Sequence, residues 1–408
     1  MHAVHFLNPA TIATTHKEEE KEIIPMNRRV GDKRFLWEKR ALACVMVTLC
    51  ICTSFMVYWG VILYDRAACT EKIAIHDKFA AAAAVGVERS IGHTYRIFVF
   101  TYARPDGLNG TLTSLLNADY SKAAAGSVDL EVFVDYRRND TPQMQQNQSA
   151  ILQLLRNFIW VHGRYKIHQR LVNVGLRLSI MEAWQPTSEI EVAVFFEDDV
   201  VVSPYWFSWA HDTLGQYAPV GAHNVIEADP RLVGLALFRP IFDELSKKHV
   251  HVNNNYAPFL LQQPCSWGAV YLPGPWRRFR DFFEKEKEKD LKVRRLEGAR
   301  NPTSNYWNYK SSWKKYLIYH MYRNGLYMMY PNLPEKLVLS TSLLLPGEHP
   351  TPPKRLFVLN VVRKEHLQNE LVERSLRQFT NMKDMKVYDV MFDEAQSVDA
   401  LLPKGGQV

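Results

Sequence analysis

Three consecutive carboxylates, Glu197, Asp198 and Asp199, are the residues of this sequence best suited to chemistry. They follow the apolar run 192–196 and precede a second one, 200–202. Adjacent negative charges repel one another, and Mn²⁺ or Mg²⁺ would relieve that repulsion because both ions prefer oxygen ligands. A cation held there would also stabilise charge that grows on a phosphate leaving group. The alternative is a solvated turn, but the apolar segments on both sides favour a metal site.

The run before the triplet is predicted to be one of several strands that alternate with helices. Apolar segments rich in β-branched and aromatic residues predict strands over 95–102, 130–134, 190–196, 232–238 and 269–272. Helical periodicity is found through Leu112, Leu115 and Leu116, and over 152–159 and 171–184. This alternation predicts an α/β domain with a mainly parallel sheet, whose ligands bind at the carboxyl ends of the strands.

The stretch 195–209, FFEDDVVVSPYWFSW, resembles the acidic motif of the GT-A nucleotide-sugar glycosyltransferases. The resemblance is to Golgi N-acetylglucosaminyltransferase I and related fungal and plant transferases in particular, and it extends from about Tyr95 to His349. It implies a GT-A fold, a Rossmann-like α/β domain with a mainly parallel sheet flanked by helices. It also implies metal-dependent transfer of a sugar from a nucleotide-sugar donor, with UDP expected, to a glycan, protein or lipid acceptor.

The same resemblance assigns roles to the triplet and to one histidine. Asp199 would bind the metal directly, while Glu197 and Asp198 would position the ribose and a water molecule. Many GT-A enzymes complete the metal shell with a histidine near the end of the domain, and His349 is the candidate here. The alternative for His349 is an ordinary histidine of a surface loop.

Three further donor-binding residues follow from the resemblance. Arg104, in the loop after the first strand, would bind the diphosphate, and Asp135, at the end of the second strand, would contact uracil. A helix that begins at Tyr165 also resembles that relative, and Arg170 then falls where a ribose or phosphate contact is expected. The alternatives are that Arg104 caps a turn and that Asp135 caps a helix.

Trp267 lies in a segment, 263–269, where transferases of this family bring sugar and acceptor together. The turn-prone residues Ser266 and Gly268 flank it. Its ring would stack on a sugar face, or it would simply belong to the core, since buried tryptophans are common there.

The catalytic base is where the sequence departs from the resemblance. An inverting transferase needs a carboxylate to deprotonate the acceptor hydroxyl. No Asp or Glu lies between Glu297 and Glu335, where the resemblance would place one. Glu348, Asp243 and Glu244 are the remaining candidates. A retaining enzyme, in which the departing phosphate takes the proton, is the other possibility.

Residues 41–64 contain no charged side chain, and 24 residues are long enough to cross a bilayer core of about 30 Å as a helix. Six basic residues lie in the 15 positions before this run and three in the 15 after it, which places the N-terminus in the cytosol. The sequence thus predicts a single-pass type II protein of the Golgi or endoplasmic reticulum. Its expected parts are a cytosolic tail (1–40), signal anchor (41–64), stalk (65–93), lumenal GT-A domain (94–351) and C-terminal extension (352–408).

Only two of the five cysteines, Cys69 and Cys265, lie outside the apolar run, so no disulfide framework is expected. Cys69 in the stalk would allow a homodimer, and Cys265 is expected to be a small buried residue, although a bond between the two stays open. Three glycosylation sequons begin at Asn109, Asn139 and Asn147. The net charge of +7 is spread along the chain without a nucleic-acid-binding motif, so nucleic acid is not an expected partner.

Two other functions are compatible with these residues. A membrane-anchored metal-dependent phosphodiesterase or pyrophosphatase would also use an acidic cluster, although such enzymes usually collect His and Asp ligands from several loops. A transferase-like scaffold that binds a glycan or partner without turnover would explain why no base is evident.

Overall fold

The computed structural model describes residues 92–136, 141–287, 296, 312–343, 345 and 359–403. The predicted tail, anchor and stalk lie outside these residues, and so do Glu348 and His349. Within them, no helix has both the length and the apolar character needed to cross a membrane.

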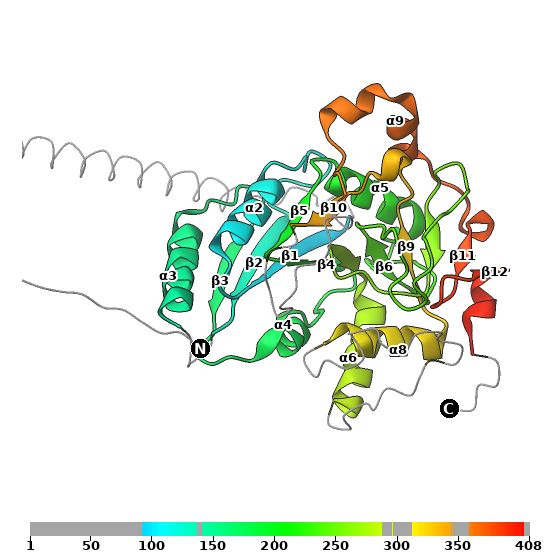
Figure 1. The fold of residues 1–408 in the computed structure, drawn as a ribbon. Coiled ribbons are helices and arrows are strands. Elements are labelled where there is room, and N and C mark those ends of the chain that lie inside the picture. The colour runs from blue at the N-terminus through cyan, green and yellow to red at the C-terminus, as the bar shows by residue number, and fades with distance from the viewer. Residues whose placement is uncertain are drawn as a thin grey trace, which may run out of the picture. The chain divides into compact units, whose positions relative to one another are not determined.

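The centre of the described domain is a ten-stranded sheet (Figure 1). Its strands are β1 (Thr94–Thr101), β2 (Val128–Val134), β3 (Tyr165–Gln169), β4 (Glu191–Glu197), β6 (Leu232–Ala236), β7 (Phe259–Leu261), β8 (Ala269–Tyr271), β9 (Tyr327–Tyr330), β11 (Val387–Tyr388) and β12 (Glu394–Ala395). Their order is β12-β11-β7-β9-β6-β8-β4-β1-β2-β3. The pairings make β7, β8 and β11 antiparallel to the other seven, which confirms the predicted α/β class with a mainly parallel sheet.

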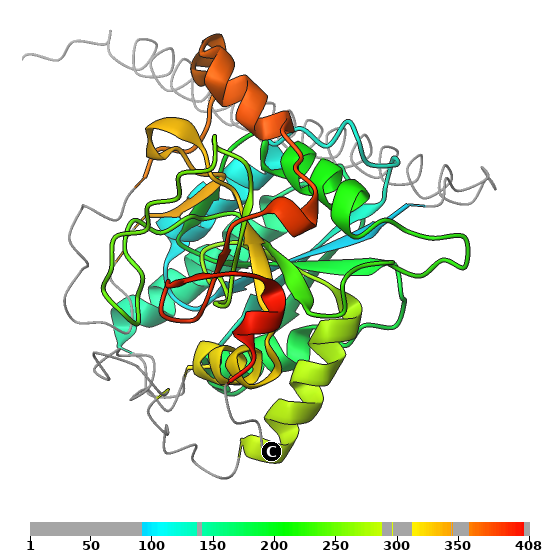
Figure 2. The same ribbon diagram turned by 90° about the vertical axis from the view of Figure 1, so that its right-hand side faces the viewer.

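Helices cover both faces of this sheet, and β1 shows why. Ile97 and Val99 point to one face and pack in a core with α2 (Pro105–Leu116), α3 (Pro142–Asn157) and α5 (Trp206–Tyr217). Phe98 and Phe100 point to the other face and pack with α4 (Gly175–Ala183), α6 (Pro273–Glu286) and α8 (Lys314–Asn324). A strand covered on both faces is apolar throughout. Figures 1 and 2 show α6 and α8 together on one side of the sheet.

A second, two-stranded sheet lies next to the end of β4. In it β5 (Val200–Val202) pairs antiparallel with β10 (Ser340–Ser342), with Thr341 opposite Val201. This pairing brings residues about 140 positions later in the chain beside the acidic triplet.

The described part of the predicted C-terminal extension belongs to the same domain. It contains α9 (Glu370–Arg377) and, in the sheet, β11 and β12. The amide of Leu260 on β7 donates to the Lys386 carbonyl at 2.9 Å, and that of Gln262 donates to the Tyr388 carbonyl at 3.0 Å. The sheet therefore continues beyond residue 352, where the sequence predicted a domain boundary. Short 3-10 helices complete the domain: η1 (Pro334–Lys336), η3 (Lys364–Gln368), η4 (Met382–Asp384) and η5 (Val398–Leu401).

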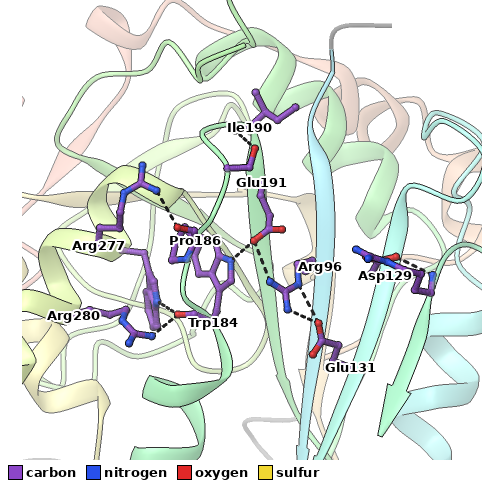
Figure 3. A network of polar contacts seen from close by, with 12 residues as sticks. Arg96, Asp129, Glu131, Trp184, Pro186, Ile190, Glu191, Arg277 and Arg280 are labelled. Carbon is purple, nitrogen blue, oxygen red and sulfur yellow. Dashed lines mark hydrogen bonds and ion pairs between the residues drawn. The ribbon is translucent and has the colours of Figure 1, made fainter. Parts of the chain in front are cut away.

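A polar network joins the sheet to α4 and α6 at the amino ends of β1 and β4 (Figure 3). Arg96 donates to Glu131 at 3.1 Å and to Glu191 at 3.2 Å. The Glu191 carboxylate also accepts from the Trp184 indole at 2.7 Å, and the Trp184 carbonyl accepts from Arg280 at 2.7 Å. The network fixes the start of β4, whose other end carries the triplet.

The segment that begins at Tyr165 is a strand and not the helix that the sequence predicted. In β3 Ile167 pairs with Val132 of the parallel strand β2. Tyr165 and Ile167 pack against the core while Lys166 between them is exposed, which is the period of two typical of a strand. The stretch is too short to distinguish helix from strand by periodicity alone.

Candidate functional site

The acidic triplet forms the turn at the carboxyl end of β4, next to the end of β1. The Asp198 amide donates to the Phe100 carbonyl at 3.0 Å. The Asp198 side chain is 1% exposed and accepts from the Thr101 hydroxyl at 2.7 Å. Glu197 and Asp199, by contrast, are only half-buried. Asp198 thus anchors the turn to β1, while its two neighbours retain contact with the surroundings.

Arg104 lies directly against the triplet. Its guanidinium donates to the Asp199 carboxylate at 3.0 Å and forms an ion pair with Asp198. Burial lowers the pKa of Arg104, but the charges of Asp198 and Asp199 outweigh this and leave the pKa raised. Arg104 stands at the N-cap position of α2 without a side-chain capping bond, so it is not a turn cap.

The triplet carries more negative charge than its surroundings offset. Burial and the charge of Asp199 raise the pKa of Glu197 to about 8, and the positive charges of Arg104 and Lys314 only partly oppose this. Burial likewise raises the pKa of Asp198, against the opposing effect of Arg104. The site therefore holds a proton that an added cation would displace.

The oxygen donors of the triplet suit a hard divalent cation. Carboxylate oxygens are the ligands that Mn²⁺ and Mg²⁺ prefer, and such an ion would take the place of the proton that Glu197 holds in the metal-free protein. In the part of the chain that the structure describes, no three His, Cys, Asp or Glu residues are grouped as a metal site. His349, the predicted second ligand, lies outside it. Asp199 and Glu197 would supply part of the shell of such an ion, and phosphate and water oxygens are further ligands of the kind it prefers.

Two segments around Asp199 escaped sequence reasoning. The Leu343 amide donates to the Asp199 carbonyl at 2.7 Å, and the Ser342 hydroxyl lies 3.4 Å from its carboxylate. Gly107, in the first turn of α2, lies so close that a Cβ there would be 2.5 Å from the Asp198 carbonyl. Residues 340–343 lie about 140 positions after the triplet, so the sequence does not show that they belong to the site. A glycine inside a predicted helix, by contrast, is a signal that could have pointed to Gly107.

Trp267 lies in a loop that packs against the end of β4. Its carbonyl accepts from the Ser340 hydroxyl, and its ring contacts Phe238 with centroids 4.6 Å apart. Gly268 has φ 95°, and a Cβ there would lie 2.9 Å from the Phe196 ring. Only glycine allows this approach. The half-buried Trp267 is thus held beside the triplet's strand, partly as a core residue.

Asp135 caps α4. Its carboxylate accepts from the amides of Val174 at 3.0 Å and Gly175 at 2.8 Å, and from the Asn173 side chain at 3.0 Å. The amides at a helix start have no partner within the helix, which explains a carboxylate at this position. Asp135 therefore has the structural role that the sequence left open as an alternative.

Arg170 forms an ion pair with Glu182 at 2.7 Å, and its guanidinium lies 6.0 Å from the Phe133 ring. Among the described residues no hydrogen bond or ion pair joins Arg170 to the acidic triplet. Its role in donor binding stays a prediction.

The two candidate bases on β6's exit loop differ in their surroundings. Asp243 is buried and accepts from the amides of Leu245 and Ser246 and from Gln263, so its carboxylate closes a turn and is poorly placed to take a proton. Glu244 forms an ion pair with Lys314 at 2.7 Å. Lys314 in turn lowers the pKa of Glu197, which links Glu244 electrostatically to the triplet.

Cys265 is buried, as the sequence predicted, with its sulfur 3.9 Å from the Phe238 carbonyl. Cys69, its potential partner, lies outside the described residues.

The family described as the SPBC1E8.03c C-terminal domain matches residues 112–290, which is less than half of the chain. That range includes the acidic triplet, Trp267 and both candidate bases of the β6 exit loop. No curated protein matches the chain.

Solved structures with some likeness to the chain include three of different origin. TarS 1–349 from S. aureus is 13% identical over 59% of this chain and 58% of its own, with a TM-score of 0.29. The mannosyltransferase PcManGT from Pyrobaculum calidifontis, in complex with GDP-Man and Mn²⁺, is 11% identical over 65% and 68%, with a TM-score of 0.32. GalNAc-T7, with UDP, GalNAc and Mn²⁺, is 12% identical over 59% and 42%, with a TM-score of 0.34. The chain thus spans less than two thirds of TarS 1–349 and of GalNAc-T7, and similarity this low carries no argument about function.

Proposed function

We propose that this chain is a metal-dependent glycosyltransferase of the GT-A fold that transfers a sugar from a nucleotide-sugar donor, with UDP expected, to a glycan, protein or lipid acceptor. One observation carries the proposal: a turn of three adjacent acids, one of which has its pKa raised to about 8, lies at the carboxyl end of the central strand β4. Ligands of parallel sheets bind at that edge. The strand order β3-β2-β1-β4, followed by antiparallel β8, supports the same fold.

The side chains around the turn have distinct tasks in this mechanism. Asp199 and Glu197 would hold the divalent ion, Mn²⁺ or Mg²⁺, which would neutralise the diphosphate leaving group. Asp198 keeps the turn on β1, and Arg104 supplies a fixed positive charge for the diphosphate. Trp267 borders the space where the sugar would lie.

Glu244 is the described carboxylate proposed to accept the acceptor's proton, because its partner Lys314 also acts electrostatically on Glu197 and because Asp243 is fully engaged. Glu348 is the other candidate for this step. His349 is proposed as the second metal ligand.

Location and assembly are further parts of the proposal. The apolar run 41–64 and the basic residues before it support a single-pass type II protein of the Golgi or endoplasmic reticulum with a lumenal catalytic domain. Cys69 supports a homodimer through the stalk.

The decisive experiment compares Asp199→Ala with Asp212→Ala in the full-length chain. A panel of nucleotide sugars is incubated with each protein and Mn²⁺, and released nucleotide is measured. We expect the Asp199 variant to lose at least about a hundredfold in nucleotide release, since one charged ligand to a catalytic metal is removed. Asp212, which pairs with Lys122 near the surface, should be replaceable without effect.

Unchanged Mn²⁺-dependent release by the Asp199 variant would refute the assignment. Product identity then separates the rival functions. UDP together with a glycoside is expected, whereas free sugar phosphate would indicate a phosphodiesterase or pyrophosphatase. A chain that binds neither UDP nor Mn²⁺ in calorimetry would be a scaffold.

A further inference from the structure

Away from the acidic triplet, a cavity of about 360 Å³ is formed by the loop after β6 and by η1. Basic, amide and aromatic side chains dominate its polar lining: Arg239, His251, Asn253, Asn255, Tyr256 and Lys336. One carboxylate, that of Glu335, also lines it and accepts from the Asn369 side chain at 2.8 Å. The volume lies in the range of small-molecule sites. Amides and guanidinium groups bind hydroxyls and anions, and a tyrosine ring offers an apolar face. The lining is therefore suited to a polar ligand with several hydroxyls.

Arg239 in this cavity has no anionic partner. Its Nε is buried without a hydrogen-bond acceptor, and within the described ranges no carboxylate forms an ion pair with its guanidinium. Burial lowers the pKa of Arg239, with Tyr256 acting in the opposite sense. Arginine stays protonated in proteins and Arg239 is half-buried, so a charge without an anionic partner there has a cost in folding free energy. An anionic ligand would compensate that charge.

The backbone around the cavity is strained. Of the seven non-glycine residues with positive φ in the described part of the chain, four line it: Asn255 (57°), Tyr256 (61°), Glu335 (55°) and Lys336 (58°). Each costs on the order of 1 kcal/mol, and such residues cluster at binding sites, where the surrounding structure maintains them.

A buried amide maintains this backbone. The Asn332 side chain, 3% exposed, donates to the Val252 carbonyl at 3.1 Å and to the Asn254 side chain at 2.6 Å. Asn254 in turn donates to the Ala257 carbonyl at 2.7 Å. These bonds join the loop to the segment before η1, so the cavity wall is preorganised.

The cavity is connected to the proposed donor site through neighbouring residues. Arg239 follows Phe238, whose ring contacts Trp267. The Trp267 carbonyl accepts from Ser340 on β10, and Ser342 on the same strand lies 3.4 Å from the Asp199 carboxylate. A short series of contacts thus links the cavity to the proposed donor site.

We infer that this cavity binds an acidic sugar, with its carboxylate or phosphate on Arg239, and that it is the acceptor site. The acceptor role rests on the proposed function, whereas binding of an acidic sugar rests on Arg239 and the cavity alone. The acceptor class is accordingly an acidic glycan or a sugar phosphate.

The test is calorimetric titration of the full-length chain with three sugars. Methyl β-glucuronide and methyl β-glucoside differ only in whether C6 carries a carboxylate, and glucose 6-phosphate carries a phosphate. We expect the chain to bind one or both acidic sugars at least about tenfold more tightly than the glucoside, because a charge-assisted bond to Arg239 forms only with an anion. The acidic sugar that binds identifies the anion.

Arg239→Met should weaken binding of that acidic sugar roughly ten- to hundredfold and leave glucoside binding unchanged. The exposed Arg156→Met, on α3, is the matched control and should change neither. Because the Arg239 substitution removes a half-buried charge that has no anionic partner among the described residues, the thermal midpoint of this variant should equal or exceed that of the wild type. If the role of Arg239 were purely structural, the substitution would lower the thermal midpoint.

Equal affinity of the wild-type chain for the acidic sugars and the glucoside would overturn the inference, even if the variant failed to fold. Unchanged affinity of Arg239→Met for the acidic sugar would overturn it as well. UDP with Mn²⁺ is titrated in parallel and should bind wild type and variant equally. Absence of UDP binding to the wild type would count against the proposed donor site, not against the acidic-sugar cavity.

Discussion

At the scale of single residues, burial divides three chemically similar carboxylates into different roles. Asp198 is buried and accepts from Thr101, so it is part of the framework. Asp199 is half-buried and accepts a hydrogen bond from Arg104, which also forms an ion pair with Asp198. Glu197 receives too little positive charge to stay ionised near neutral pH, since burial and Asp199 raise its pKa to about 8. The free energy of unfolding of the metal-free protein should therefore depend on pH.

Without metal, stability should fall as the pH rises. The folded state holds the Glu197 proton up to about pH 8, whereas the ordinary value is 4.5, so between these values the unfolded chain binds fewer protons. The contribution is complete below the ordinary value and is lost as the pH passes through the folded value. One proton corresponds to a slope of roughly 1.4 kcal/mol per pH unit at most. Urea unfolding in the presence of a chelator, at several pH values, measures it.

Glu197→Gln is the control for this slope, because glutamine has the shape of the protonated acid and does not titrate. Between about pH 5 and 8, the free energy of unfolding of the variant should change less with pH than that of the wild type. If wild type and variant show parallel pH profiles, Glu197 is not the titrating group.

At the scale of elements, the first turn of α2 and the turn after β4 must approach closely. A Cβ on Gly107 would lie 2.5 Å from the Asp198 carbonyl and 2.7 Å from a Leu345 methyl group. One turn further along the same helix, a Cβ on Gly110 would meet nothing closer than 3.4 Å. The two glycines therefore differ in tertiary context although they share a helix.

Substituting alanine for each glycine separates the effect of helix propensity from the effect of the close contact with the acidic turn. Gly110→Ala should stabilise the chain by about 0.5 to 1 kcal/mol, since alanine is the better helix former. Gly107→Ala should destabilise it by about 1 to 3 kcal/mol and weaken nucleotide binding, because α2 must move away from the acidic turn. Urea unfolding and calorimetry with UDP and Mn²⁺ measure both. Equal effects of the two substitutions would show that the contact at Gly107 is unimportant.

At the scale of the whole domain, the C-terminal segment completes the sheet and the loop before Trp267. β11 pairs with β7, the Gln262 side chain donates to the Leu401 carbonyl at 3.0 Å, and that of Gln263 donates to the Val390 carbonyl at 2.6 Å. Both glutamines are buried, so their amides need these acceptors.

Ending the chain at residue 385 should therefore prevent stable folding, since it exposes β7 and leaves buried amides without acceptors. A chain that ends at residue 403 retains all of these contacts and is the control. Soluble yield and a cooperative thermal transition are the measurements. A chain ending at 385 that unfolds cooperatively, with unchanged nucleotide binding, would show that the segment is an independent addition.

The sequence by itself determined the fold class and the location of the acidic turn. Long apolar runs that alternate with helical periodicity specify strands covered by helices, and β4 was found because its apolar run leads directly into three carboxylates. These are local patterns, and local backbone preferences and burial produce them. The short edge strand β3 was mistaken because five residues contain too little of either period.

Only the tertiary structure decided which polar residues belong to the acidic site. Arg104 and Asp135 both follow strands, yet one lies on the triplet and the other caps α4. Ser342 lies beside Asp199 through the β5–β10 pairing, and the cavity around Arg239 forms where the loop after β6 meets η1. Contacts between residues far apart in the chain depend on how strands pair and helices pack, and a linear pattern does not encode that packing at single-residue resolution.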